Sequence, residues 1–356
     1  MTIQRKDLIG CADGGDVAAG PLLIIQIPCL NEEETLPGTL ADLPRQVAGF
    51  GRVEWLVIDD GSTDETVAVA KRCGVDHVVS HGRNRGLAAA YMTGLDAAIR
   101  LGADVIVNTD ADNQYRADGI GDLTAPVLAG LADLVVGERP IEDIDEFSKV
   151  KKVLQRLGTR VVRAFSGTEV RDAASGFRAV SRETALRLRV FGRYTYTMET
   201  LVQAGWEGFR VASVPVSVNP KTRESRLVRS IPRYVFRSAT TIIRTFALYR
   251  PFRFFTILGT PPFILGAILI LRWIALYLFS DTYTSRLPSL FLGLGATLFA
   301  IQIWSVAFLA DLLAANRRVS SDFLVAERRA AVEPSARGSH LSFMTRHADY
   351  PHDREQ

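Results

Sequence analysis

Two aspartates one residue apart are the sharpest chemical signal in this sequence. Asp110 and Asp112 follow Val105–Thr109, an apolar run typical of a buried strand, so both carboxylates should emerge where that strand ends. Mg²⁺ and Mn²⁺ prefer such oxygen ligands and commonly share them with the phosphates of a substrate. A pair of this spacing is by itself often a helix cap or a solvated turn. The interpretation as a metal site therefore depends on the neighbouring motifs.

Two motifs that follow other apolar runs carry polar groups of the kind that bind a nucleotide. They are Pro28-Cys-Leu-Asn-Glu-Glu33 and Asp59-Asp-Gly-Ser-Thr-Asp64. In the second motif, Gly61 permits a tight turn and Thr63 is expected to cap the following helix. The paired acids exceed what capping needs, and Asp60 can accept hydrogen bonds from a base or a ribose.

A further motif and its flanking arginines can supply positive charge for phosphates. The motif is Asp172-Ala-Ala-Ser-Gly-Phe-Arg178, with Arg139 upstream and Arg223 and Arg226 downstream. Arginine binds phosphate through two parallel N–H donors, which makes these residues candidates. Each arginine alone is more often a surface charge than a ligand, so the interpretation depends on their combination.

The elements that must position these motifs alternate between residues 22 and 218. Strands are expected at residues 22–27, 54–58, 77–80, 104–109, 133–136 and 211–218. Helical periodicity covers residues 33–47, 64–73, 87–101 and 149–165. Apolar strands separated by amphipathic helices predict an α/β fold with a mostly parallel sheet covered on both faces. Ligands of such sheets bind at the carboxyl ends of the strands, where the motifs lie.

The C-terminal third predicts a membrane hairpin. Residues 254–279 and 290–313 are two apolar stretches, each about long enough to cross a bilayer. A buried helical hairpin is the alternative, but both stretches are apolar all round and longer than a usual core helix. Arginines precede the first stretch and follow the second, which predicts that the α/β domain and both termini are cytoplasmic.

Residues 230–253 are basic and amphipathic. On a helix over residues 231–249, the apolar side chains share one side and the arginines lie opposite. This pattern is typical of a helix that lies in a membrane interface, and a surface helix of the globular domain is the alternative.

Composition excludes several classes of protein. The 356 residues are 47% hydrophobic and 23% charged, so a packed core is expected and wholesale disorder is not. The net charge of +3 is too small to indicate nucleic-acid binding. Three cysteines without metal-like spacing exclude a disulfide scaffold and a zinc finger. Residues 1–20 lack the apolar core of a signal peptide and predict a flexible leader, and residues 316–356 predict a mobile, charged tail.

Taken in order, the motifs resemble the family 2 glycosyltransferases of GT-A (Rossmann-like) fold. They are more closely similar to the group of dolichyl-phosphate mannose synthases and bacterial polyprenyl-phosphate glucosyltransferases with two C-terminal transmembrane helices. The resemblance covers about residues 22–313. It implies a catalytic domain over residues 21–229, amphipathic juxtamembrane helices over 230–253 and a two-helix transmembrane hairpin over 254–315.

The resemblance also implies roles for individual residues. Those that would hold the nucleotide are Pro28, Asn31, Glu33 and Asp60. Those that would bind Mg²⁺ or Mn²⁺ are Asp110, Asp112 and Gln114. Those that would bind the donor and acceptor phosphates are Arg139, Ser175, Arg178, Arg223 and Arg226. The catalytic set is Asp110, Asp112, Arg139, Arg178 and Glu199. Glu199 matches an acidic position of the family, and an orienting role for Arg178 or the sugar is preferred over a role as base.

The implied activity is inverting transfer of a sugar from a nucleotide-sugar to a polyprenyl or dolichyl phosphate at the cytoplasmic face of a membrane. A UDP-sugar is favoured as donor over GDP-mannose, and relatives with such hairpins form tetramers, which suggests a homo-tetramer here. One alternative is a membrane glycosyltransferase that elongates a lipid-linked saccharide or polysaccharide. The other is a catalytically silent membrane scaffold, which the presence of Asp60, Asp110 and Asp112 disfavours.

Overall fold

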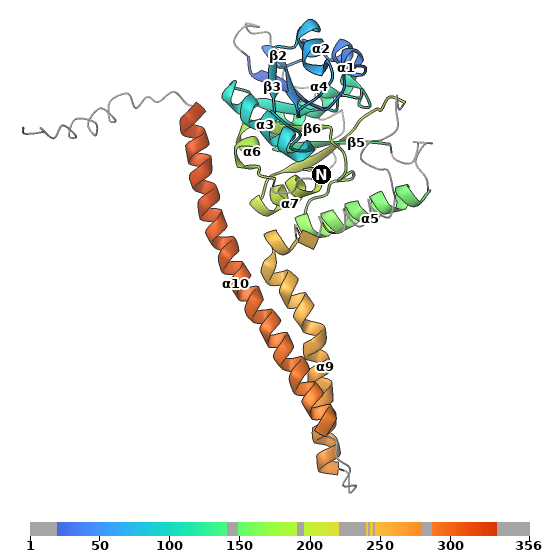
Figure 1. The fold of residues 1–356 in the computed structure, drawn as a ribbon, viewed down its shortest axis with the longest axis vertical. Helices are drawn as coiled ribbons and strands as arrows, with labels where there is room; N and C mark the ends of the chain where they lie inside the picture. Colours follow the sequence, from blue (N-terminus) through green and yellow to red (C-terminus); the bar gives the residue numbers. More distant parts are fainter. Residues whose placement is uncertain are drawn as a thin grey trace, which may run out of the picture.

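An α/β domain carries two long C-terminal helices that extend away from it (Figure 1). The computed structural model describes residues 20–140, 149–190, 196–220, 240, 243–244, 246–279 and 287–332. The helices of the domain are α1 (Leu36–Asp42), α2 (Thr66–Arg72), α3 (Leu87–Arg100), α4 (Ile120–Leu128), α5 (Lys149–Ser166), α6 (Arg182–Arg187) and α7 (Thr197–Glu207), with a short 3₁₀ turn η2 (Ala117–Gly119). The two long helices are α9 (Pro251–Phe279) and α10 (Leu287–Val332).

The sheet has seven strands in the order β3-β2-β1-β4-β6-β5-β7. Their bounds are β1 (Leu22–Cys29), β2 (Arg52–Asp59), β3 (His77–Ser80), β4 (Val105–Asn108), β5 (Leu134–Glu138), β6 (Arg178–Ser181) and β7 (Val211–Pro215). The pairs β1–β2, β1–β4, β2–β3 and β5–β7 are parallel, which confirms the predicted, mostly parallel sheet. Strand β6, which the sequence analysis did not identify, lies antiparallel to both β4 and β5.

The core forms two layers because successive strand residues point to opposite faces of the sheet. On one face, Ile24 and Ile58 are buried with Tyr91 and Leu95 of α3. On the other face, Leu23 is buried with side chains of α1 and α4. All eight residues of β1 are buried, since this central strand has neighbouring strands on both sides and helices on both faces. The motifs that follow β1, β2 and β4 are therefore held at one rigid edge.

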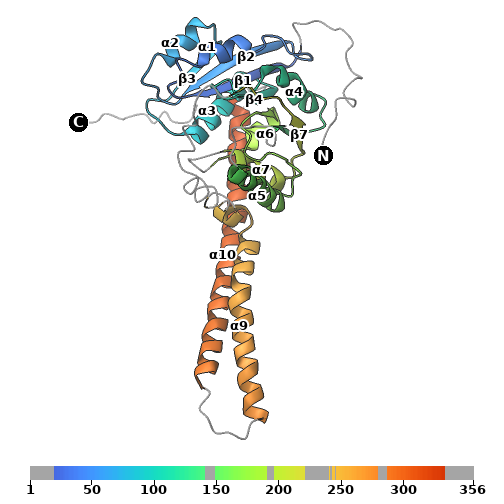
Figure 2. The same ribbon diagram turned by 90° about the vertical axis from the view of Figure 1, so that its right-hand side faces the viewer.

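Helices α9 and α10 each contain an 18-residue stretch apolar enough to cross a membrane, with mean hydropathies of 2.1 and 1.9 over those stretches. They lie side by side below the domain (Figure 2). Small residues let their backbones approach: a Cβ built on Gly266 would lie 2.7 Å from the carbonyl oxygen of Gly293, and Ala300 is fully buried. Close crossing at small residues is characteristic of helices that pack within a bilayer.

Helix α10 continues beyond its apolar part and returns to the α/β domain. The guanidinium of Arg328 donates to the carbonyl oxygen of Leu186 at 3.0 Å and pairs with Asp96 at 2.7 Å. The boundary predicted at residue 316 thus falls inside α10, and residues 316–332 are helical, because these contacts extend the helix past the apolar stretch. Residues 333–356, the leader over 1–19 and most of the amphipathic segment over 230–253 lie outside the described residues.

We expect the hairpin to be sensitive to one methyl group. A Cβ on Gly266 would lie 2.3 Å from Oγ1 of Thr297, so Gly266→Ala must push the helices apart and should destabilise the hairpin by about 1–3 kcal/mol. Gly295→Ala is the matched control on α10, since a Cβ there meets nothing within 4 Å. Thermal unfolding in detergent measures both. Equal midpoints for the two variants would contradict the close crossing.

Candidate active site

The two aspartates of the central motif emerge just after β4, as predicted. Asp110 and Asp112 are both half-buried at the edge of the sheet. The backbone amide of Gln114 donates to Oδ1 of Asp112 at 3.2 Å, and the Thr39 hydroxyl donates to the carbonyl oxygen of Ala111 at 2.9 Å. The turn is thus held both by its own aspartate and by helix α1, so the backbone that carries the two carboxylates is fixed in position.

Gly176 packs directly against the carboxylate of Asp110. A Cβ built on Gly176 would lie 3.3 Å from both carboxylate oxygens, so even a methyl group there would require the carboxylate to shift. The position of Gly176 is set by buried polar groups: the Asn108 amide donates to its carbonyl oxygen at 2.9 Å, and its own amide donates to the Tyr115 hydroxyl at 3.0 Å. The motif around Gly176 and the turn after β4 therefore form one structural unit.

A buried network beneath this unit links the strands to helix α7. The Gln26 amide of β1 donates to Asn108 at 2.9 Å, and Asn108 donates to the Tyr196 hydroxyl at 2.8 Å. The ring of Tyr196 stacks on Tyr91 of α3, with centroids 3.8 Å apart. Because Asn108 also donates to the carbonyl oxygen of Gly176, this network helps to hold Gly176 against Asp110.

Burial and neighbouring charges both act on Asp110. Burial, followed by repulsion from the Asp112 carboxylate, raises the pKa of Asp110 to about 7, while Arg139 acts in the opposite direction. Arg139 is buried and is held by Asp172 through two hydrogen bonds of 2.6 and 3.1 Å. The structure thus brings the predicted residues Asp110, Asp112 and Arg139 together, with Asp172 as the group that orients the arginine.

The residues present fit a divalent cation that is shared with a substrate. The carboxylates of Asp110 and Asp112 repel each other, and a bound cation would neutralise their negative charge. Gln114 in the same turn offers an amide oxygen as a further ligand. Among the described residues, no group of three or more His, Cys, Asp or Glu side chains could enclose a metal ion. Mg²⁺ is commonly held by one or two carboxylates together with substrate phosphates, so this donor set suits such a cation.

The residues predicted to hold the nucleotide join two turns at the neighbouring strand ends. Pro28 is buried in β1 opposite Ile58. Oδ1 of Asn31, a residue with φ of 53°, accepts from the amide of Thr63 at 2.8 Å. The two turns are therefore held together by their own side chains at neighbouring strand ends.

The expected helix cap at Thr63 is wrong. Oδ1 of Asp64 accepts from the amide of Thr66 at 3.1 Å, and Oε2 of Glu33 reaches across from the first turn to accept from the amide of Glu65 at 2.8 Å. Thr63 is instead engaged by Asn31. A capping group that comes from a distant segment cannot be predicted from the residues next to the helix alone.

Asp60 anchors the loop that leads into α3. Its carboxylate is buried and accepts three hydrogen bonds: from Nδ1 of His81 at 2.7 Å and from the amides of Arg85 and Gly86 at 2.9 and 2.8 Å. Gly61 permits this approach, because its φ is 80° and a Cβ there would lie 2.6 Å from the backbone of Arg83. Asp60 therefore shapes the loop over residues 82–86 beside the predicted nucleotide site.

Removing this anchor should loosen the loop. In Asp60→Ala, the buried ring of His81 and two part-buried backbone amides lose their acceptor, and we expect a loss of about 2–4 kcal/mol in the free energy of unfolding. Limited trypsin digestion should cleave faster after Arg83 and Arg85, which lie in the exposed loop. Asp122→Ala, an exposed acid at the start of α4, is the control. Unchanged digestion of the Asp60 variant would argue against the anchor.

Two residues predicted to bind phosphate lie beneath the site. Ser175 is fully buried, and its hydroxyl accepts from the amide of Phe177 at 3.3 Å. Arg178 is 1% exposed and donates to the carbonyl oxygens of Ser175 at 2.8 Å and Ala173 at 3.0 Å, and to the Thr200 hydroxyl at 2.6 Å. Both side chains thus bind the backbone on either side of Gly176 rather than facing an open surface.

The remaining predicted residues have different outcomes. Glu199 is buried in the first turn of α7, next to Thr200, which contacts Arg178. Arg223 and Arg226 lie outside the described residues.

Several residues that organise the site were missed by sequence reasoning. They are His81, Asn108, Tyr115, Asp172 as a partner for Arg139, and Tyr196. Asn108 carried a usable signal, since an amide within an apolar strand must find buried partners. The others carried none, because their partners are distant in sequence.

The sequence of this chain is similar to those of known glycosyltransferases. A family model described as Glycosyl transferase family 2 matches residues 24–188. An uncharacterized glycosyltransferase of Mycobacterium tuberculosis is 36% identical over 210 residues, which are 57% of this chain and 88% of that protein. The polyprenol monophosphomannose synthase of Mycolicibacterium smegmatis is 30% identical over 205 residues, 54% of this chain and 76% of that protein.

One further relative and one solved structure complete the comparison. The UDP-N-acetylglucosamine–dolichyl-phosphate N-acetylglucosaminyltransferase of Methanococcus voltae is 28% identical over 223 residues, 56% of this chain and 86% of that protein. Glucosyl-3-phosphoglycerate synthase of Mycobacterium tuberculosis, solved with Mn²⁺, UDP-glucose and phosphoglyceric acid, has a TM-score of 0.52 and 23% identity. It covers 65% of this chain and 80% of that one, and the likeness shows a shared fold.

Proposed function

Because this chain belongs to glycosyl transferase family 2, we propose that it transfers a sugar from a nucleotide-sugar to a polyprenyl phosphate at a membrane surface. The observation that carries the proposal is that the aspartate site and the membrane-length helices belong to one connected structure. The domain that presents Asp110 and Asp112 at its sheet edge is bonded to α10, a helix long and apolar enough to cross a membrane. The names of the Mycolicibacterium smegmatis and Methanococcus voltae relatives state that they act on polyprenol or dolichyl phosphate.

The proposed roles follow the contacts around the sheet edge. Asp110, Asp112 and Gln114 would hold Mg²⁺ or Mn²⁺ together with the donor diphosphate, and the bound cation would offset charge on the leaving group. Arg139, fixed by Asp172, adds positive charge beside Asp110. These groups act in a partly buried site, where electrostatic interactions are stronger than in water.

The other predicted residues would act by position. Asn31, Glu33 and Asp60 shape the turns on which the nucleotide would lie, because their side-chain oxygens accept from backbone amides of those turns. Arg178 and Ser175 would hold Gly176 against Asp110. For Glu199 we propose an orienting role in α7.

The reaction we propose is a single displacement. An oxygen of the lipid phosphate attacks the anomeric carbon, the bond from that carbon to the diphosphate breaks, and nucleoside diphosphate leaves, which inverts the configuration. A phosphate monoester has a second pKa of about 6 and is largely dianionic at neutral pH, so it needs no dedicated base. The acceptor is anchored by its isoprenoid tail, which explains why the domain stands on a membrane-length hairpin. We place the domain on the cytoplasmic side, because arginines flank the apolar stretches.

A donor and acceptor screen tests this function. The full chain in membranes is given UDP- or GDP-sugars, Mg²⁺ or Mn²⁺, and either polyprenyl phosphate or a lipid-linked saccharide, and the lipid products are weighed by mass spectrometry. We expect one nucleotide-sugar to yield a polyprenyl-phosphate-linked monosaccharide. Product from the lipid-linked saccharide alone would indicate chain elongation instead. No turnover with any donor would favour a silent scaffold.

A further inference from the structure

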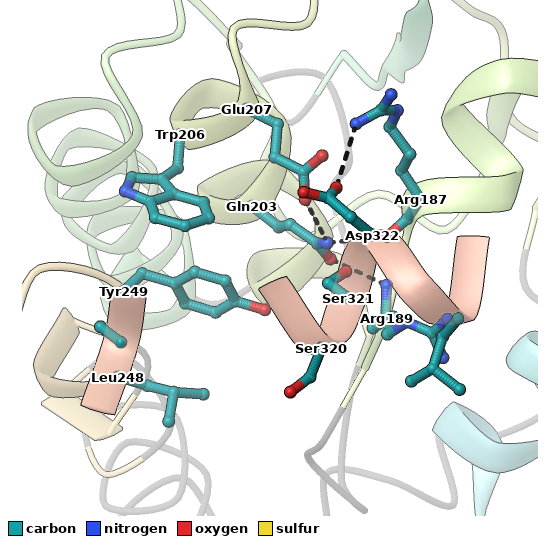
Figure 3. Close-up of a pocket in the computed structure, with 12 residues that line it drawn as sticks. Arg187, Arg189, Gln203, Trp206, Glu207, Leu248, Tyr249, Ser320, Ser321 and Asp322 are labelled. Atoms are coloured by element: carbon teal, nitrogen blue, oxygen red, sulfur yellow. Dashed lines mark hydrogen bonds and ion pairs between the residues drawn. The ribbon is translucent and has the colours of Figure 1, made fainter. Parts of the chain in front are cut away.

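A cavity of about 510 Å³ lies between the α/β domain and the returning part of α10. It is separate from the aspartate site. Its walls come from the end of α6 and the segment after it, the end of α7, residues 248–249, and from α10 Ala314 together with residues between 320 and 324. Figure 3 shows Trp206 and Tyr249 on one side of the cavity, and Arg187 and Arg189 on the other. None of the site residues predicted from the sequence is among the residues that line this cavity.

Arg189 has buried donors that nothing in the described part of the chain accepts. Its Nε and Nη2 atoms are buried and have no hydrogen-bond partner among the described residues. Its backbone amide donates to Oε1 of Gln203 at 2.8 Å. Burial, followed by repulsion from Arg328, lowers the pKa of Arg189, whereas the charges of Asp96 and Glu207 act in the opposite direction. A guanidinium with buried, unbonded donors is costly unless an anion completes it.

The neighbouring acids already have other partners. Asp322 lies 3.9 Å from Arg187, which also donates to Glu183 at 3.0 Å. Oε1 of Glu207 accepts from the side-chain amide of Gln203 at 2.9 Å.

The fourth nearby acid is Asp96, which pairs with Arg328 at 2.7 Å. Among the described residues, Nε and Nη2 of Arg189 thus remain without an acceptor. Two neighbouring guanidinium donors suit the two oxygens of a phosphate.

The position and lining of the cavity favour the phosphate of a lipid. Tyr249 lies two residues before α9 begins, and Ala314 lies where α10 leaves its apolar part. The rings of Trp206 and Tyr249 meet edge to face at 5.9 Å, and aromatic side chains of this kind are enriched at the membrane–water interface. Leu248 and Leu324 add apolar surface, so the cavity offers both a cationic end and an apolar wall.

We propose that this juxtamembrane cavity binds the phosphate headgroup of an anionic lipid, with Arg189 as its main ligand. The inference rests on the proposed membrane insertion of α9 and α10, and it adds a site to the proposed function. The site is distinct from the transfer site: Trp206 lies ten residues along α7 from Tyr196, which is about 15 Å of helix. The lipid would join the domain to the hairpin at the point where α10 returns.

Lipid titration of the purified full chain tests the site. The delipidated protein in neutral detergent is titrated with dihexanoyl phosphatidylglycerol, farnesyl phosphate, dihexanoyl phosphatidylcholine or inorganic phosphate, and each Kd is measured by calorimetry. We expect Arg189→Gln to weaken binding of at least one anionic lipid tenfold or more. Arg72→Gln, an exposed arginine on α2, should change each Kd less than twofold. Phosphatidylcholine should not distinguish the variants.

A second variant and a stability readout guard against misfolding. Ser321→Glu brings a carboxylate into the cavity from α10 and should also abolish lipid binding, although Arg189 is intact. Without lipid, Arg189→Gln should be at least as thermostable as the native chain, because it removes two buried donors that have no acceptor among the described residues.

The lipid arms distinguish the sources of the phosphate. An effect on phosphatidylglycerol identifies a membrane phospholipid, and an effect on farnesyl phosphate alone identifies the isoprenoid acceptor. Native-like affinity in Arg189→Gln, or inorganic phosphate binding as tightly as either lipid, would overturn the proposal. The titration uses no sugar donor, so an inactive chain still answers it, and loss of transfer with intact lipid binding would count only against the proposed function.

Discussion

Replacing Asp112 by asparagine should abolish sugar transfer and leave the fold intact. The amide keeps the oxygen that accepts from Gln114, so the turn after β4 should survive. It removes one of the two charges that would hold a divalent cation beside the donor diphosphate. Losing such an electrostatic group typically costs about 10²- to 10³-fold in rate, and we expect a loss in this range. Mass analysis of the lipid product, with a titration of Mn²⁺, measures it.

The matched control for this variant is Asp118→Asn. Asp118 is an exposed aspartate of the same region, paired with Arg116 at 2.7 Å, and its replacement should leave transfer nearly unchanged. Native activity in Asp112→Asn at low Mn²⁺ would remove Asp112 from the cation site. An equal loss in both variants would point to a general effect on the loop.

Gly176→Ala should impair transfer without a comparable loss of stability. The new methyl would lie 3.0 Å from the Tyr196 hydroxyl and 3.3 Å from both Asp110 oxygens. Tyr196 is held by Asn108, so the half-buried carboxylate is the group that must move. A displacement well under 1 Å at a reacting centre is costly, and we expect roughly a 10- to 100-fold lower kcat. Initial rates at saturating donor, together with thermal unfolding, separate the two effects.

Gly121→Ala serves as the control for Gly176→Ala. Gly121 lies in α4, where a Cβ meets nothing within 4 Å, and alanine there should be neutral or slightly stabilising. A fully active Gly176 variant would show that the Asp110 carboxylate tolerates displacement, and would weaken the case that the motif around Gly176 positions it.

Local sequence patterns were sufficient to predict the buried strands, the helices with one apolar face, and the motifs that follow the strands. The strand ends after which Asp60 and Asp110 lie were predictable, because a buried strand must be apolar and the polar residues that follow it must lie at its end. Strand β6 was not, since its four residues are a strand only through their pairing with β4 and β5. Contacts between distant segments determined that strand.

The same distinction separates the roles of charged residues. Arg178 and Asp60 are chemically suited to phosphate and nucleotide, and the sequence could not show that buried protein groups already engage them. Arg189 is the opposite case: an ordinary arginine in the sequence becomes a candidate ligand because α10 returns to the domain and buries its donors.

The sequence by itself determined the α/β class, the order of the motifs and the two membrane-length helices, because periodicity and the length of apolar runs are local properties. Only the tertiary structure decided which side chains face the site and which support it from below. The physical reason is that hydrogen-bond partners are selected by three-dimensional proximity. Asn108 and Gly176, 68 residues apart, share one bond beneath Asp110, and no spacing rule in the chain predicts it.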